Sequence, residues 1–124
     1  MLFRSLARAE RWQREGRAVY VVINDGGDRK SEITACRAVF VEWDDRPIEW
    51  QLTAWRELGL PEPTLMVRTG GRSIHGYWVL QEPLSPEDWQ PLQEAWIAHA
   101  GGDRHCGDPS RVMRLPGEIG RAHV

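Results

Sequence analysis

The chain has 124 residues, of which 41% are hydrophobic and 27% are charged. These fractions exclude an intrinsically disordered chain, and the length allows about one domain. The formal net charge of −2 excludes a protein that coats nucleic acid through bulk positive charge. We therefore expect a single domain over residues 1–124, either a minimal unit or part of a longer protein.

The sequence contains no membrane or secretion signal. No apolar run approaches the roughly 18–20 residues that a membrane-spanning helix needs. The first residues include Arg4, Arg8 and Glu10, where a secretory signal has an apolar core. We therefore expect a cytoplasmic protein without a membrane partner.

Cysteine and arginine usage adds two constraints. Cys36 and Cys106 are too few for a disulfide framework or a four-thiolate zinc site, and we expect both to be reduced. Every basic residue except Lys30 is an arginine, whose planar guanidinium suits phosphate groups and base edges. High-GC codon usage produces the same bias.

The first third of the chain predicts a helix and two strands. Residues 3–15 place their apolar side chains on one stripe, which predicts a short amphipathic helix that ends at Gly16. Residues 18–23 are β-branched and aromatic and predict a buried strand, which a turn cluster at residues 24–28 ends. Residues 35–43 predict the next strand.

The remainder alternates between helices and strands. The expected elements are a helix over 47–58, strands over 64–69 and 73–80 joined by a Gly-Gly hairpin turn, a helix over 85–100 and a strand over 111–115. Ser85 has the position of an N-cap, followed by Pro86 at the first helical position. From residue 35 the order is β-α-β-β-α-β, which predicts an α/β (α+β) fold with an RRM-like or ferredoxin-like core, preceded by a helix and an additional strand.

The first candidate site is a pair of acids at the end of the strand over 35–43. Residues two apart in a strand face the same way, so Glu42 and Asp44 point together while Trp43 faces the other side. Two adjacent carboxylates repel unless a cation lies between them, and hard oxygen ligands suit Mg²⁺ or Mn²⁺. The alternative is that these acids merely end the strand and stabilise the N-terminus of the following helix.

The second candidate site surrounds the Gly-Gly turn. Ser73 and His75 share one face of their strand, and Arg72 precedes them. Glycine amides, a hydroxyl, a histidine and guanidinium groups suit a triphosphate, although the spacing of a Walker loop is absent. The alternative is a structural histidine.

The third candidate site is the segment 103–117. It contains two acids, Asp103 and Asp108, and two arginines three residues apart, Arg111 and Arg114. Asp108 stands directly before a proline, as a turn residue does.

In this order, the three segments resemble the three motifs of the archaeo-eukaryotic primase superfamily, and most of all its primase-polymerase branch from plasmid, phage and mobile-element replication proteins. The hydrophobic strand ending in acid-x-acid is matched by VFVEWD at 39–44, and the Ser-x-His motif by SIH at 73–75. The acid followed by an arginine-rich strand is matched by Asp103 and by SRVMRLPG at 110–117. Glu-x-Asp departs from the family's frequent Asp-x-Asp or Asp-x-Glu, which leaves Asp45 as a competing ligand.

The resemblance implies a DNA primase or DNA polymerase, a nucleotidyltransferase that makes primers or extends DNA on a single-stranded template. It implies two divalent ions, Mg²⁺ or Mn²⁺, held by the catalytic residues Glu42, Asp44 and Asp103. It implies nucleotide binding by Arg72, Ser73, His75, Arg111 and Arg114. The implied partners are dNTP or NTP, a template and primer, and a replicative helicase domain or protein.

Two other functions fit the same residues. One is a non-catalytic module that binds single-stranded nucleic acid with an RRM-like sheet, and the other is a metal-dependent phosphohydrolase that uses the carboxylates and His75. The sequence leaves open the choice between ribo- and deoxyribonucleotides. It also leaves open whether Asp103 or Asp108 is the third ligand, although the position of Asp103 after the helix favours it.

Overall fold

The computed structural model describes residues 7–8, 10–12, 14–16, 20–69 and 72–114. Within the helix predicted over residues 3–15, the described residues up to Arg14 are helical. Glu15 lies in a turn. The other residues of that predicted helix, residues 18–19 of the next predicted strand, Gly70 and Gly71 of the predicted hairpin turn, and residues 115–117 of the third candidate segment lie outside the described residues.

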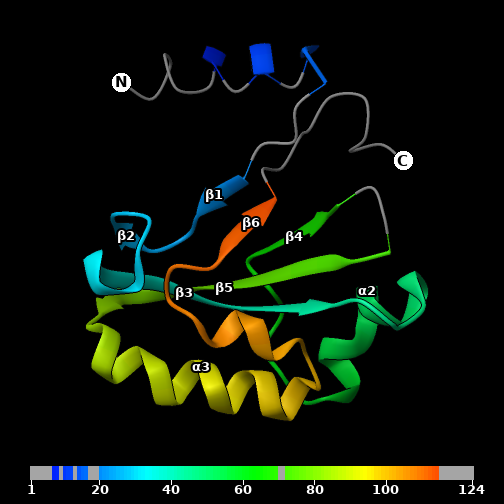
Figure 1. The fold of residues 1–124 in the computed structure, drawn as a ribbon. Coiled ribbons are helices and arrows are strands. Elements are labelled where there is room, and N and C mark those ends of the chain that lie inside the picture. Colours follow the sequence, from blue (N-terminus) through cyan, green and yellow to red (C-terminus); the bar gives the residue numbers. More distant parts are fainter. Residues whose placement is uncertain (1–6, 9, 13, 17–19, 70–71, 115–124) are drawn as a thin grey trace.

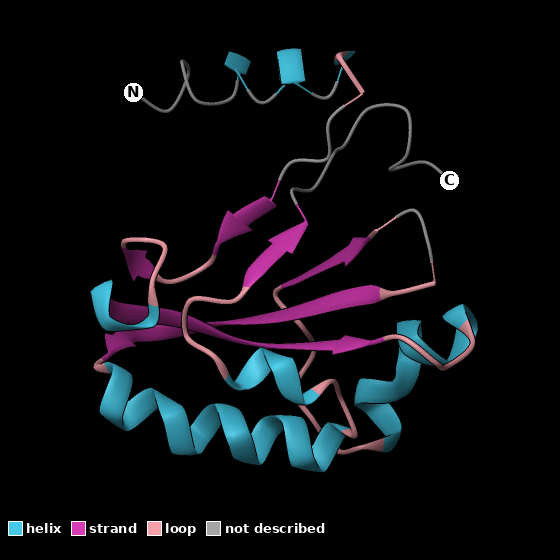
Figure 2. Ribbon diagram, viewed as in Figure 1, coloured by secondary structure: helices cyan, strands magenta, loops and turns pink. Residues whose placement is uncertain are grey.

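A sheet of four antiparallel strands, in the spatial order β2-β3-β5-β4, forms the centre of the molecule. Its strands are β2 (Asp25–Gly26), β3 (Ile33–Trp43), β4 (Leu65–Arg68) and β5 (Ile74–Leu84). The helices α2 (Ile48–Glu57) and α3 (Pro86–Ala100) lie along one side of this sheet, and a two-stranded sheet of β1 (Tyr20–Val22) and β6 (Val112–Arg114) lies on the other (Figures 1 and 2). Two 3₁₀ turns, η1 (Lys30–Glu32) and η2 (Arg104–Gly107), precede β3 and follow α3.

The predicted fold class and the predicted order β-α-β-β-α-β are confirmed from β3 onward. The turn cluster predicted over residues 24–28 contains the short strand β2, and two boundaries differ from the prediction by more than one residue. The structure starts β3 at Ile33, directly after η1, and extends β5 to Leu84, four residues past the predicted end. The added residues have strand partners, because Ile33 lies opposite Gly26 of β2 and Leu84 lies opposite Cys36 of β3.

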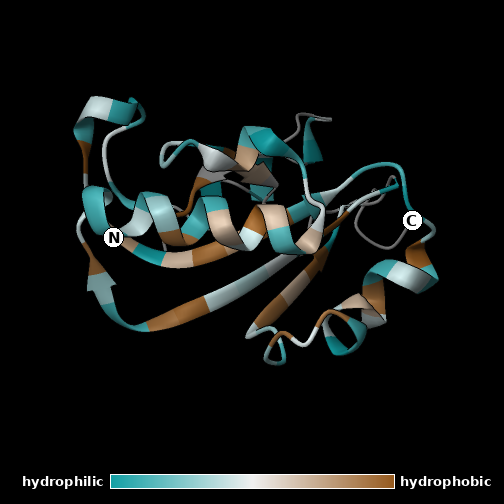
Figure 3. Cartoon of the chain, turned by 90° about the horizontal axis from the view of Figure 1, so that it is seen from below, coloured by the Kyte–Doolittle hydropathy of each residue, from teal (hydrophilic) through white to brown (hydrophobic). Residues whose placement is uncertain are grey.

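Local signals define both ends of α3. The Ser85 side chain accepts a hydrogen bond from the Asp88 N–H, and Pro86 begins the helix, as expected. Gly101 ends it with φ 68°, a left-handed conformation that glycine adopts without strain. Hydrophilic and hydrophobic stretches alternate along α3 in Figure 3, as expected for a helix with one apolar face.

The last strand does not complete the ferredoxin-like sheet. In that arrangement the final strand would lie beside β3, whereas here β6 pairs antiparallel with β1, and Met113 lies opposite Val21. The physical reason lies at the outer edge of β3, the edge that faces away from β5. Beyond its short pairing with β2, that edge already has other hydrogen-bond partners.

Side chains of α3 occupy the outer edge of β3. The Trp89 Nε1–H donates to the Ala38 carbonyl at 2.8 Å. The Gln93 amide accepts from the Phe40 N–H at 3.0 Å and donates to the Phe40 carbonyl at 2.7 Å. Because an exposed strand edge has unpaired backbone groups that must find partners, these bonds replace a neighbouring strand.

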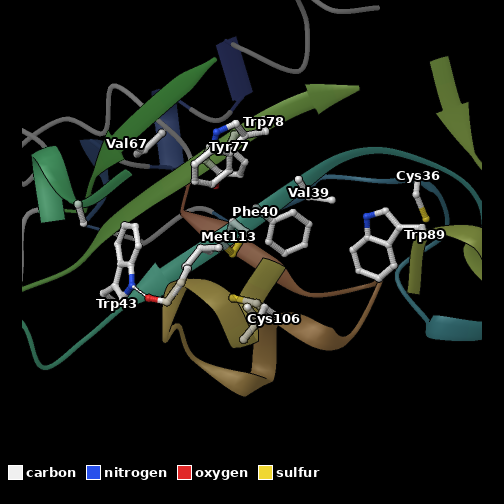
Figure 4. Packing of buried hydrophobic residues seen from close by; sticks show 14 of the residues in the cluster. Cys36, Val39, Phe40, Trp43, Val67, Tyr77, Trp78, Trp89, Cys106 and Met113 are labelled. Atoms are coloured by element: carbon white, nitrogen blue, oxygen red, sulfur yellow. Dashed lines mark hydrogen bonds between the residues drawn. The ribbon is translucent and has the colours of Figure 1, made fainter. Parts of the chain in front are cut away.

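The two faces of the sheet carry different residues. Trp43 lies on the helix side, where its Nε1–H donates to the Ala100 carbonyl of α3 at 2.9 Å. Phe40 lies on the opposite face among buried residues, with its ring centroid 6.1 Å from that of Tyr77 and 6.0 Å from that of Trp89 (Figure 4). Trp43 therefore packs away from Glu42, as predicted.

No helix in the described part of the chain is long and apolar enough to cross a bilayer.

Both cysteines are fully buried and free, and we predict that neither reacts in the folded protein. Burial, helped by the charge of Asp25, raises the pKa of the Cys36 thiol to about 11, and burial, helped by Glu42, raises that of Cys106 to about 12. At pH 8 the reactive thiolate is therefore scarce as well as inaccessible. Iodoacetamide labelling followed by mass spectrometry should modify neither cysteine in buffer and both in denaturant; stoichiometric labelling of the native chain would contradict this packing.

Candidate active site

Three carboxylates from two distant parts of the chain lie together. Glu42 is the penultimate residue of β3, Asp44 follows that strand, and Asp103 follows α3. One carboxylate oxygen from each residue lies within 4.8 Å of the other two. The Asp103 N–H donates to the Glu42 carbonyl at 2.8 Å, so the loop after α3 is bonded to the end of β3.

Asp108 has a different position and a local role. Its carboxylate accepts hydrogen bonds from the N–H and the hydroxyl of Ser110, both at 2.8 Å. Such bonds to a residue two positions later are typical of an aspartate in a turn. Among the described residues, the acidic cluster contains Asp103 as its third member.

A hydroxyl, an imidazole and a guanidinium surround the acids. The Ser73 hydroxyl donates to the Asp44 carboxylate. His75 lies directly opposite Glu42 in the pairing of β3 with β5, and its Nε2 is 3.8 Å from Glu42 Oε1. Arg111, just before β6, donates to Glu42 Oε2 at 3.1 Å. The structure therefore brings residues of all three sequence segments to one place.

These neighbours keep Glu42 ionised. The side chain of Glu42 is only 12% exposed, and burial alone would raise the pKa of its carboxyl group. The facing His75 imidazole and then the Arg111 guanidinium outweigh burial and lower that pKa to about 2. Glu42 is thus a carboxylate at neutral pH.

The donor set fits a divalent cation that prefers oxygen ligands. Glu42, Asp44 and Asp103 supply three carboxylates with converging oxygens that could hold a metal ion. An open cavity of about 320 Å³ adjoins them, lined by Trp43, Asp44, Asp45, Gly101, Gly102 and Asp103. A cavity of this size has room for a hydrated ion and part of a ligand.

The structure does not show two of the predicted nucleotide-binding residues in contact with the three carboxylates. Arg72 is exposed, and its backbone carbonyl accepts a hydrogen bond from Gln51 Nε2 at 2.8 Å. Arg114 lies in β6 opposite Tyr20, and its side chain lies outside the description. Their roles remain predictions.

Sequence reasoning missed Gln51, which holds the Ser73 segment in place. Its Oε1 accepts from the Ile74 N–H at 2.6 Å, and its Nε2 also donates to the Arg46 carbonyl at 2.7 Å. Gln51 therefore joins the loop after β3 to the start of β5. A signal was present, since this fully buried glutamine interrupts the apolar stripe of α2.

Sequence reasoning also missed Gly102, where the loop after α3 passes very close to β3. A Cβ at this position would lie 2.5 Å from Val41 Cγ1 and 3.3 Å from the Glu42 carbonyl oxygen. The absence of a side chain at Gly102 therefore permits the short bond between Asp103 and Glu42.

We predict that Gly102→Ala moves Asp103 away from Glu42. The added methyl group would clash with Val41, so the loop must shift. This shift should lower the free energy of unfolding by about 1–3 kcal/mol and weaken Mn²⁺ binding about tenfold. Calorimetric titration with Mn²⁺ and thermal unfolding measure both effects. The control is Gly107→Ala, because a Cβ there would come no closer than 3.9 Å to a neighbour; equal Mn²⁺ affinity in both variants would contradict the prediction.

No protein-family model matches the sequence, and no curated protein matches it. Among solved structures, the chain is similar to the AEP domain of the primase-polymerase (PrimPol) of cyanophage S-2L. The two share 47% sequence identity and a TM-score of 0.83, and the match covers 88% of this chain and 59% of that one. This chain thus spans about three fifths of the length of that relative. The motif resemblance and this structural likeness agree, and the chain belongs to the archaeo-eukaryotic primase superfamily.

Proposed function

We propose that this chain carries the nucleotidyltransferase centre of a DNA primase-polymerase that acts in phage, plasmid or mobile-element replication. The observation that carries the proposal is the convergence of Glu42, Asp44 and Asp103 beside His75 and Arg111. The likeness to a phage primase-polymerase domain supports it. The substrates would be dNTP or NTP, a single-stranded DNA template and a primer.

Glu42, Asp44 and Asp103 would hold two divalent ions, Mg²⁺ or Mn²⁺. Two-ion centres supply an activated attacking hydroxyl and charge neutralisation at the leaving oxygen. The site suits this role because one oxygen of each carboxylate lies within 4.8 Å of the other two.

His75 and Arg111 have further capacity to bind a triphosphate. His75 Nδ1 and Arg111 Nε are buried and, within the described chain, have no hydrogen-bond partner. Buried polar atoms normally have partners, so unpartnered ones next to the acidic cluster are candidate groups for a ligand to satisfy. Phosphate oxygens accept such bonds well, and a guanidinium fork suits them geometrically.

The remaining nucleotide contacts would come from Ser73, Arg72 and Arg114. Ser73 now donates to Asp44, so it links the proposed triphosphate site to the proposed ion site. Arg72 is exposed next to Ser73 and would add positive charge at the rim. A replicative helicase domain or protein stays a prediction, as does the cytoplasmic location.

We predict that Glu42→Ala/Asp44→Ala abolishes template-dependent incorporation. The double variant removes two of the three converging carboxylates, so the proposed ions lose most of their ligands. Extension of a labelled primer on single-stranded DNA with Mn²⁺ and dNTP measures the loss. Glu57→Ala is the control, because Glu57 is an exposed acid at the end of α2, outside the acidic cluster and the lining of the cavity, and it should retain most of the activity.

Three other results, from extension, binding and product-release assays, would replace the proposal. Equal extension by the double variant would exclude these carboxylates from the chemistry. Single-strand binding that persists in EDTA, without extension, would indicate a binding module. Release of phosphate or nucleoside monophosphate without extension would indicate a phosphohydrolase.

A paired substitution decides between the two candidates for the third ligand. We predict that Asp103→Asn lowers Mn²⁺ affinity by about 100-fold or more, since a direct ligand contributes at least as much as the groups that support it. Asp108→Asn should leave the affinity nearly unchanged, because Asp108 lies outside the acidic cluster. Electron paramagnetic resonance of free Mn²⁺ measures both, and the opposite ranking would make Asp108 the ligand.

A further inference from the structure

Gln93 is a fully buried polar residue on the apolar side of α3. It lies four residues after Trp89 and four before Ile97, and all three are buried. A hydrocarbon side chain at this position would continue the apolar stripe. A buried amide is costly unless its hydrogen bonds are made, so its presence calls for a specific role.

The Gln93 amide makes three hydrogen bonds to two segments of backbone. It accepts from the Phe40 N–H at 3.0 Å and donates to the Phe40 carbonyl at 2.7 Å, which are outer-edge groups of β3. It also donates to the Cys106 carbonyl of η2 at 2.8 Å. One side chain therefore links three elements: α3, β3 and η2.

Both segments carry a carboxylate of the acidic cluster. Phe40 precedes Glu42 by two residues, and Cys106 follows Asp103 by three. The Cys106 N–H donates to the Asp103 carbonyl at 3.1 Å, so η2 is itself bonded to the residue that carries the third acid. A displacement of η2 relative to β3 would therefore change the separation of Asp103 and Glu42.

We propose that Gln93 is a positioning residue, which sets the separation of Glu42 and Asp103 by holding β3 and η2 at a fixed distance. It acts through backbone groups and touches neither carboxylate. Its consequence for ion binding rests on the proposed function, whereas its consequence for the backbone does not. Loss of the amide leaves the Phe40 N–H, the Phe40 carbonyl and the Cys106 carbonyl buried without this hydrogen-bond partner, which is unfavourable. We expect β3 and η2 to move apart so that these groups find other partners.

Gln93→Met and Gln93→Asn test this role. Methionine keeps the length and removes all three hydrogen bonds, while asparagine keeps the amide but is one methylene too short to reach both segments. The matched control is Gln90→Met. Gln90 lies one turn earlier in α3 and donates to the Gly107 carbonyl of η2 at 2.6 Å, so it links α3 to η2 without contacting β3.

The first measurement is hydrogen exchange at the Asp103 amide, which donates to the Glu42 carbonyl and reports on the junction without any metal. We expect exchange to quicken about tenfold or more in both Gln93 variants, relative to amides of β4 and β5, and to change little in Gln90→Met. The second measurement is Mn²⁺ affinity. It should fall about 10–100-fold in the Gln93 variants, the range typical of groups that support metal ligands, and stay within about threefold in the control.

Each outcome decides one question. If Gln93→Met does not fold, as circular dichroism would show, Gln93→Asn gives the answer. Unchanged Asp103 exchange in a folded Gln93 variant, or the same change in Gln90→Met, overturns the positioning role. If the unmodified chain binds no Mn²⁺, the proposed function loses its ion site, while Asp103 exchange still decides the role of Gln93.

Discussion

The outer edge of β3 is the constraint on which the candidate site depends. A strand in the centre of a sheet has backbone groups pointing to both sides, and all of them need partners. In this molecule β5 satisfies one side, and the two-residue strand β2 satisfies only the start of the other. Trp89 and Gln93 of α3 and the N–H of Asp103 satisfy most of the rest. The same hydrogen bonds that complete the strand therefore bring the third acid to the first.

Charge at the site is balanced by residues from other elements. Glu42 is largely buried, and a buried carboxylate is stable only with positively charged or donating partners. His75 provides one from the neighbouring strand, and Arg111 provides another from the segment that enters β6. β6 pairs with β1 and not with β3, and the segment that leads into β6 brings Arg111 to Glu42 at 3.1 Å. The departure from the expected sheet thus has a direct electrostatic consequence.

The mild acidity of the chain is compatible with a nucleic-acid substrate. Three of its negative charges converge at one site, where divalent ions would neutralise them. Arg72, Arg111 and Arg114 belong to the second and third candidate segments, and Arg111 is already at the site. Local arrangement, and not net charge, is therefore the relevant property of this chain.

The sequence by itself determined the element order, the caps of α3 and the side of β3 on which Glu42 lies. These features follow from patterns within a few residues, namely strand alternation and capping, which read the same in any context. Motif resemblance also singled out Asp103. Tertiary structure alone decided that β6 pairs with β1, and that Gln93, Gln51 and Gly102 support the site. The physical reason is that a strand edge accepts any donor or acceptor of suitable geometry, so its partner is chosen by three-dimensional packing and not by local periodicity.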